Sequence, residues 1–271
     1  MRIYSLFDSP IIKTRITSAE VRKKEMILGY FTGPFLAMIS NAIFGSYLNR
    51  YYSDIIGWTD TTRFGFFSAL LPAASVVFVI IGNLMIGRLI DHTRTVHGKA
   101  RPFMLLSAPL IPITFALLFS LPLNSSPIMQ MIWIAVSYNL YYAVAYPLFF
   151  TAHSSMVALS TRSSKHRGIL ATFSNASNVA AVGLGANILV PMLLQRSLFV
   201  IKEGKLDTAE SYNNWRIVMV VLCFITFIAI LIEYYYTRER ITEENVRLSI
   251  KEEKLSIPKQ ANSCIKSSYW W

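Results

Sequence analysis

The stretch GNLMIGRLIDHTRTVHGKARP, residues 82–102, joins two long apolar runs through a short basic loop. The run before it covers residues 64–86, and the run after it covers residues 103–121. Each run is about as long as the roughly 20 apolar residues that cross the hydrocarbon core of a bilayer. The loop is basic, and short cytoplasmic loops retain Lys and Arg. We therefore predict that this loop lies at the cytoplasmic surface of a membrane.

The composition of the whole chain indicates an integral membrane protein. Of its 271 residues, 54% are hydrophobic and 15% are charged, whereas soluble domains carry about a quarter charged residues. The net charge of +11 is spread over several loops instead of one surface, so nucleic acid is not an expected partner. The cysteines, Cys223 and Cys264, have neither disulfide nor zinc spacing. We expect no metal and no cofactor.

Six apolar runs predict six membrane spans, at residues 26–48, 64–86, 103–121, 128–150, 169–194 and 215–236. The predicted fold is an all-α six-helix transmembrane bundle over residues 26–236, between a cytoplasmic segment, 1–25, and a cytoplasmic linker, 237–271. The loops and termini on one side hold 20 of the 26 Lys and Arg residues. This asymmetry places both termini in the cytoplasm of a multi-pass protein of the cell membrane.

Several motifs of the chain resemble those of a known family. YYSDIIG follows the first span, and the basic loop reads G-x-L-x-D-x-T-x-x-x-x-G-K-x-R-P. The tyrosine-rich fourth span ends in YPLFF, and the loop after it ends in KHRG. Together these motifs resemble the glycoside-pentoside-hexuronide:cation symporters, a melibiose-permease-like branch of the major facilitator superfamily. The resemblance covers the chain from about Gly29 onward.

The resemblance implies the N-terminal half of a twelve-span fold that moves sugars or glycosides by alternating access, coupled to Na⁺ or H⁺. It also implies that the first basic loop is a cytoplasmic gate, formed by Arg88, Asp91, Arg94, Lys99 and Arg101. The chain ends in SSYWW, which resembles the interfacial start of a seventh span. We therefore expect a missing C-terminal half to complete the pathway, with a second copy of the chain as the alternative.

Aromatic and amide side chains in three spans are candidates for a sugar site. Aromatic rings stack on the apolar face of a pyranose while amides bond its hydroxyl groups. Amides are costly in lipid unless they face protein or water. We expect five residues at similar membrane depths to line the cavity, with Tyr141 and Phe149 supported by the resemblance: Asn41, Tyr141, Phe149, Asn175 and Asn178. Packing through interhelical hydrogen bonds is an equally open interpretation for the amides.

The coupling cation is less well supported than the sugar. The resemblance places the family's intramembrane carboxylates at Met38, Val79, Asn83 and Ala145, and none of these is acidic. An ion pathway through lipid is normally marked by such a group. We therefore expect weak coordination at Asn83, uniport, or coupling in the other half. Glu233 lies close to the cytoplasmic end of the sixth span.

Two other classes of function are an enzyme and a non-transporting subunit. An enzyme would need a His, Cys or carboxylate constellation, but the four histidines show no metal spacing. His153 beside Ser154 and Ser155 is the one conceivable nucleophilic pair, and sequence neighbours rarely form one. We predict no enzymatic activity. A non-transporting or homodimerising six-span subunit stays open as the third class.

Overall fold

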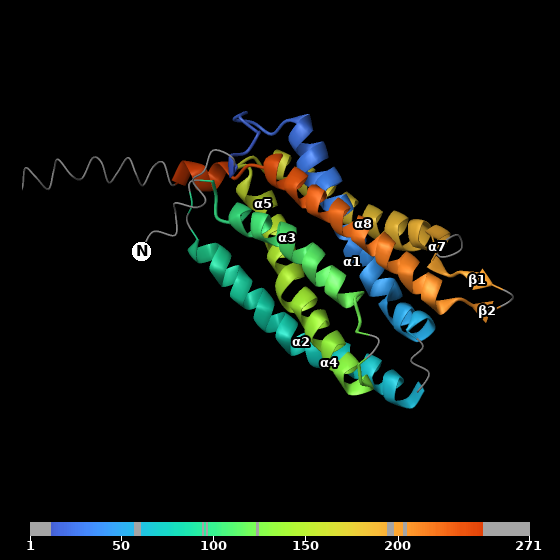
Figure 1. Ribbon diagram of the computed structural model, residues 1–271. Coiled ribbons are helices and arrows are strands. Elements are labelled where there is room, and N and C mark those ends of the chain that lie inside the picture. The colour runs from blue at the N-terminus through green and yellow to red at the C-terminus, as the bar shows by residue number, and fades with distance from the viewer. Residues whose placement is uncertain are drawn as a thin grey trace, which may run out of the picture.

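The computed structural model describes residues 12–56, 61–93, 95, 97–122, 125–193, 198–202 and 205–245. Within that part, six helical units are long and apolar enough to cross a membrane. Figure 1 shows them running side by side as one bundle. The predicted gate residue Arg94, Cys264 and the SSYWW end lie outside the described residues.

Three of the six units contain π-helical segments, labelled η, in line with α-helices. The first three units consist of η3 (Glu25–Thr32), α1 (Gly33–Arg50) and η4 (Tyr51–Ile55), then α2 (Thr61–His92), then α3 (Arg101–Leu118). The last three consist of α4 (Pro127–Asn139), η5 (Leu140–Ala145) and α5 (Tyr146–Leu159), then α6 (Ser164–Ala180), η6 (Ala181–Leu189) and α7 (Val190–Leu193), then α8 (Thr208–Tyr235). A short hairpin of β1 (Ile201–Lys202) and β2 (Lys205–Leu206) precedes α8.

The predicted all-α fold with six spans is confirmed, but five of the six helical units are longer than expected. The first continues past residue 48 to Ile55, and the fourth continues past residue 150 to Leu159. The sixth begins at Thr208, before the predicted start at 215. Hydropathy marks only the segment inside hydrocarbon, whereas a helix continues wherever its backbone hydrogen bonds do. The extension of the fourth unit brings His153 into the bundle.

Proline explains two of the π-helical segments. η3 ends just before Pro34, and η5 ends just before Pro147. A proline lacks the backbone N–H and its ring crowds the carbonyl one turn earlier. A wider turn before the proline relieves this conflict, and such turns often occur at functional positions. The first span is therefore irregular in its first third, and the fourth span is irregular near its middle.

Small residues allow the helices to pack closely. α8 packs against both α1 and α3, α6 packs against η3, and α2 packs against the fourth span (Figure 1). A Cβ atom at Gly82 of α2 would overlap the Ala143 carbonyl of η5. A Cβ at Gly33 would lie 2.8 Å from the Glu233 Cβ. Glycine at these contacts lets the backbones approach, as is common between membrane helices.

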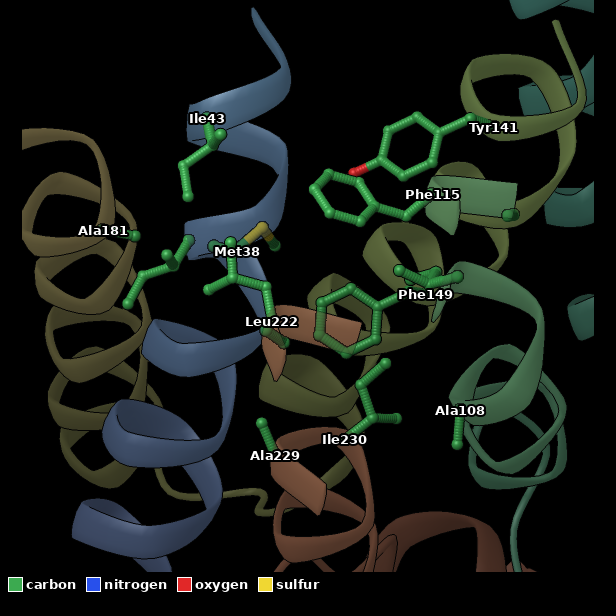
Figure 2. Close-up of a cluster of buried hydrophobic side chains, with 14 of the residues drawn as sticks. Met38, Ile43, Ala108, Phe115, Tyr141, Phe149, Ala181, Leu222, Ala229 and Ile230 are labelled. Carbon is green, nitrogen blue, oxygen red and sulfur yellow. The ribbon is translucent and has the colours of Figure 1, made fainter. Parts of the chain in front are cut away.

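Apolar side chains from several spans fill the centre of the bundle. Figure 2 shows Met38 of α1, Phe115 of α3, Tyr141 and Phe149 of the fourth span, and Leu222 of α8 facing one another. All five are buried. The core thus lies between the first, third, fourth and sixth spans, and two of the predicted sugar-site residues belong to it.

Candidate functional site

Contacts between the first and fourth spans show which residues share a level of the bundle. The Tyr141 hydroxyl donates to the Asn41 Oδ1 at 3.4 Å. Nearer the end that carries the basic loop, the Tyr30 hydroxyl donates to the Met156 carbonyl at 3.2 Å. The two spans therefore run antiparallel, with Asn41 level with Tyr141 and Tyr30 level with Met156.

Asn41 and Tyr141 form a polar pair at the middle of the bundle. Asn41 lies near the centre of the 31-residue helical unit Glu25–Ile55 and is half-buried, whereas Tyr141 is buried. The Tyr141 ring centroid lies 5.2 Å from that of Tyr142 and 6.0 Å from that of Tyr146. Both neighbouring rings are half-buried. We call Asn41 and Tyr141 the midplane pair.

The other three predicted sugar-site residues lie lower, toward the basic loop. Phe149 is about two turns beyond Tyr141, about 12 Å along the helix, and it is buried. Asn178 is half-buried, and its Nδ2 donates to the Ser174 carbonyl at 3.3 Å. Asn175 is exposed. The five residues are thus divided between two levels and do not lie at one depth.

A buried trio of ionisable and hydroxyl groups occupies this lower level. The His153 Nδ1 lies 2.5 Å from the Glu233 Oε1, and the His153 Nε2 lies 2.6 Å from the Ser174 Oγ. His153 is 1% exposed and Glu233 is 0% exposed. Hydropathy does not indicate these partners, because the apolar run of the fourth span ends at residue 150. Of the serines next to His153 in the sequence, Ser154 is exposed, and the Ser155 hydroxyl donates to its own helix.

The order carboxylate, imidazole and hydroxyl is that of a hydrolase triad, but the surroundings do not suit acyl transfer. Ser174 lies inside α6, where backbone N–H groups bond within the helix and cannot form an oxyanion hole. The imidazole and the carboxylate are closed off from solvent. The trio therefore does not support the hypothesis of an enzyme.

The positions at which the resemblance places cation-binding carboxylates carry neutral side chains. Asn83 is exposed on α2, and its Nδ2 donates to the Val79 carbonyl of its own helix at 2.8 Å. Met38 and Ala145 are buried apolar groups. Across the described part of the chain, no three His, Cys, Asp or Glu side chains are grouped as metal ligands.

The basic loop divides into a surface part and a buried part. The Lys99 Nζ lies 2.9 Å from the Asp91 Oδ1, and both side chains reach solvent. Arg88 is exposed. Arg101, however, is 0% exposed, and its guanidinium lies 4.4 Å from the centre of the Tyr234 ring. Arg101 is thus an anchor between α3 and α8, while Lys99 and Asp91 remain at the surface.

Comparison with known proteins places the chain in a family. A sequence model of the family described as MFS/sugar transport protein matches residues 29–271. The chain belongs to this family. An isoprimeverose transporter of Lactiplantibacillus pentosus is 26% identical over 263 residues, which cover 93% of this chain and 50% of that protein. The chain therefore spans about half the length of this curated relative.

In this MFS/sugar transport protein, the carboxylate of Glu239 explains the G-K-x-R-P part of the loop. It accepts the backbone N–H groups of Lys99, Ala100 and Arg101 at 2.8 to 2.9 Å, at the start of α3. Anions are favoured at a helix N-terminus. Gly98 has a φ of +116°, and a Cβ there would lie 2.5 Å from the carboxylate. Glycine is therefore needed both for the turn and for the close approach.

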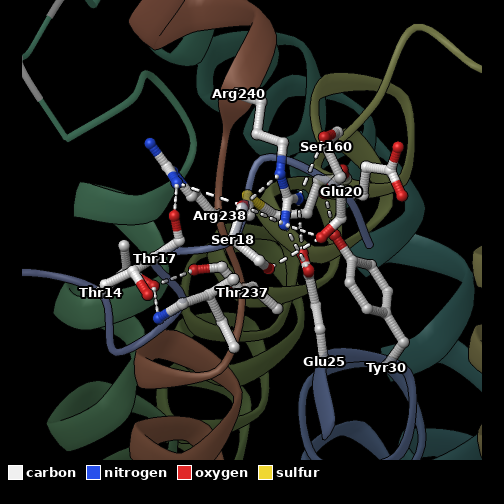
Figure 3. Close-up of polar contacts among 12 residues, drawn as sticks. Thr14, Thr17, Ser18, Glu20, Glu25, Tyr30, Ser160, Thr237, Arg238 and Arg240 are labelled. Atoms are coloured by element: carbon white, nitrogen blue, oxygen red, sulfur yellow. Dashed lines mark hydrogen bonds and ion pairs between the residues drawn. The ribbon is translucent and has the colours of Figure 1, made fainter. Parts of the chain in front are cut away.

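Hydrogen bonds and an ion pair connect residues 12–25 with residues 237–245 at this end of the bundle. From the sequence alone, these residues belong to separate cytoplasmic segments. Figure 3 shows the Arg240 guanidinium between Glu25 and the backbone of Ser18. Its nitrogens lie 2.7 and 2.9 Å from the two Glu25 carboxylate oxygens. The Thr14 hydroxyl donates to the Thr237 carbonyl at 2.8 Å. Residues 237–245 are thus held against the bundle here.

Proposed function

We propose that the chain is the N-terminal half of a secondary transporter that moves a sugar or glycoside by alternating access. The midplane pair carries this proposal, because transporter substrate sites lie near the bilayer midplane. Membership of a sugar-transport family supports the substrate class. The relative's name makes isoprimeverose the first glycoside to test.

The chemistry of the midplane pair suits a sugar. The bond from Tyr141 holds the Asn41 amide in one orientation, and the half-buried amide can then donate to a sugar hydroxyl. The half-buried rings of Tyr142 and Tyr146 offer apolar faces on which a pyranose can stack. In this proposal Asn175 and Asn178 line the lower part of the pathway, and Phe149 supports it from within the core.

A second six-helix bundle forms the other wall of the pathway, either a C-terminal half or a second copy of this chain. The support lies in amides that the bundle leaves exposed: Asn83 on α2, Asn175 on α6 and Asn187 on η6. Amides facing lipid are costly, so these faces need protein or water beside them. Alternating access then comes from rocking of the two bundles about the midplane.

The orientation and the gate are also part of the proposal. The distribution of Lys and Arg favours a cell-membrane protein with both termini in the cytoplasm. The surface ion pair of Lys99 with Asp91 is then at the cytoplasmic mouth, where its partners change as the bundles rock. Coupling to a cation, Na⁺ or H⁺, completes the proposed cycle.

Calorimetric titration of the full-length transporter with isoprimeverose and other glycosides tests the site. A lost hydrogen bond to a bound hydroxyl costs about 1–3 kcal/mol, so Asn41→Ala should weaken binding roughly five- to 150-fold. The matched control is Asn49→Ala, at an exposed amide near the end of α1, which should bind as wild type does. Equal affinities of the two variants would remove the midplane pair from the sugar site.

A further inference from the structure

The trio of Glu233, His153 and Ser174 lies between four spans and apart from the midplane pair. Glu233 comes from α8, His153 from α5 and Ser174 from α6, while Gly33 of the first span packs on Glu233. One carboxylate oxygen of Glu233 contacts the imidazole, and the other, Oε2, is buried and has no hydrogen-bond partner among the described residues. Buried polar atoms of this kind are rare and call for an explanation.

The charge of the trio depends on a single proton. With a neutral imidazole and an ionised carboxylate, the trio carries one negative charge in a region that excludes water, which is expensive. One added proton gives an imidazolium beside a carboxylate, and the net charge becomes zero. The state with zero net charge avoids that cost.

The surrounding ionisable groups leave this proton to the trio. From η3, Tyr30 lies with its ring centroid 6.4 Å from that of His153, and its hydroxyl is bonded to Ser160 and to a carbonyl. Glu25, at the start of η3, is paired with Arg240 of the chain after α8. Within the described residues, the only ion pair recorded for Glu233 is that with His153.

Among the described residues on the remaining sides, none forms an ion pair with this carboxylate. On α8 itself, the Tyr234 hydroxyl donates to the Ile12 carbonyl, and its ring lies under the guanidinium of Arg101 from α3. α6 contributes the hydroxyl of Ser174. The imidazole of His153 is therefore the basic group that can balance Glu233.

We propose that His153, Glu233 and Ser174 bind the coupling ion of this transporter and that the ion is a proton. In the empty site the His153 Nδ1–H donates to Glu233, and the Nε2 accepts from the Ser174 hydroxyl. The incoming proton bonds to Nε2, and the Ser174 oxygen turns from donor to acceptor. A hydroxyl can serve in both roles, so the trio keeps both hydrogen bonds in either state.

A sodium ion does not suit the same groups. Hard cations take shells of carboxylate, carbonyl and water oxygens. Here the imidazole ring stands between the two oxygen-bearing side chains and bonds both of them. The trio can take up a proton while both of its hydrogen bonds keep the same partners.

Two contacts connect the trio to the sugar pathway. The Phe149 ring lies nearly parallel to the His153 ring, at 18° and with centroids 6.0 Å apart. The Asn178 amide donates to the Ser174 carbonyl. Gly33 and Pro34, where η3 meets α1, also lie beside Glu233, so bending of the first span changes its surroundings. Movement of these groups when sugar binds would change how tightly the proton is held, which is what coupling requires.

The inference rests on the proposed sugar transport, and its test separates the two. The full-length transporter is reconstituted in liposomes that contain a pH-sensitive dye, and two quantities are measured with isoprimeverose: exchange of labelled for unlabelled sugar, and acidification driven by a sugar gradient. We expect both sugar exchange and sugar-driven acidification in wild type, with or without Na⁺.

In His153→Gln and in Glu233→Gln, exchange should stay within about threefold of wild type, on the order of 0.7 kcal/mol in the exchange step. Sugar-driven acidification should fall at least about tenfold, on the order of 1.4 kcal/mol. His166→Gln, at a histidine near the start of α6, is the matched control and should keep both.

Three results would overturn the inference while leaving sugar transport intact: exchange without acidification in wild type, acidification that requires Na⁺, or unchanged acidification in both variants. Absence of exchange in folded wild type would instead refute the proposed function.

A measurement on wild type tests the inference even if the variants fail to fold. Infrared difference spectra recorded on adding sugar should show a histidine ring changing protonation. Spectra without any histidine band would contradict the inference.

Discussion

Replacing Glu239 with alanine removes the acceptor at the start of α3. The carboxylate is 0% exposed and accepts three backbone N–H groups and the Thr242 hydroxyl. A hydrogen bond to a charged group contributes about 1.5–3 kcal/mol, but entering water would recover part of this. Removing this acceptor leaves several donors without a partner, at about 1–3 kcal/mol for each one that stays buried, so we expect Glu239→Ala to cost about 3–5 kcal/mol in total. Glu239→Gln keeps an oxygen acceptor and should cost about 1–3 kcal/mol.

Thermal unfolding of the purified protein in detergent, followed by tryptophan fluorescence, measures this loss. At roughly 2–4 °C per kcal/mol, Glu239→Ala should lower Tm by about 6–20 °C. The control is Glu244→Ala, whose partner Arg162 lies 3.1 Å away with both side chains more than half exposed. Such surface pairs contribute about 1 kcal/mol or less. If the two alanine variants melted within about 2 °C of each other, the carboxylate would not hold α3 in place.

Gly82→Ala should destabilise the protein by about 1–3 kcal/mol, because the new methyl group overlaps the Ala143 carbonyl. The control Gly87→Ala places its methyl group in open space and should not destabilise the protein. Equal melting temperatures of the two variants would contradict the close contact of α2 with η5. Asp91→Asn should slow sugar uptake by the full-length transporter with little change in sugar affinity, and unaltered uptake would rule out a gate at this residue. A reporter fused after Trp271 should be active in the cytoplasm, and activity only outside the cell would refute the proposed orientation.

The sequence predicts the number of spans well because crossing a membrane needs a long apolar run, which is a local property. It predicts their ends poorly. α5 continues to Leu159 through His153, Ser154 and Ser155, which hydropathy places in a loop. The helix persists there because its polar groups are bonded inside the bundle or within the helix itself.

The site shows the same limit. Tyr141 and Asn41 can be selected from the sequence as polar groups that must avoid lipid, but their bond joins residues 100 positions apart. The contact of His153 with Glu233 joins residues 80 positions apart. Such pairs depend on which helices are neighbours and on their register, and neither can be read from one span at a time. Glu239 was missed for the same reason, since its partners precede it by 138 to 140 positions.

We infer that the midplane pair binds a sugar that the protein carries across a membrane. Exchange of labelled isoprimeverose by the full-length transporter in liposomes tests this, with wild type compared with Asn41→Ala at a sugar concentration near the wild-type Kd. We expect exchange well above that of protein-free liposomes for wild type, and exchange reduced severalfold for the variant. Folded wild type that exchanges neither isoprimeverose nor any other glycoside, or a variant that exchanges as fast as wild type, would contradict it.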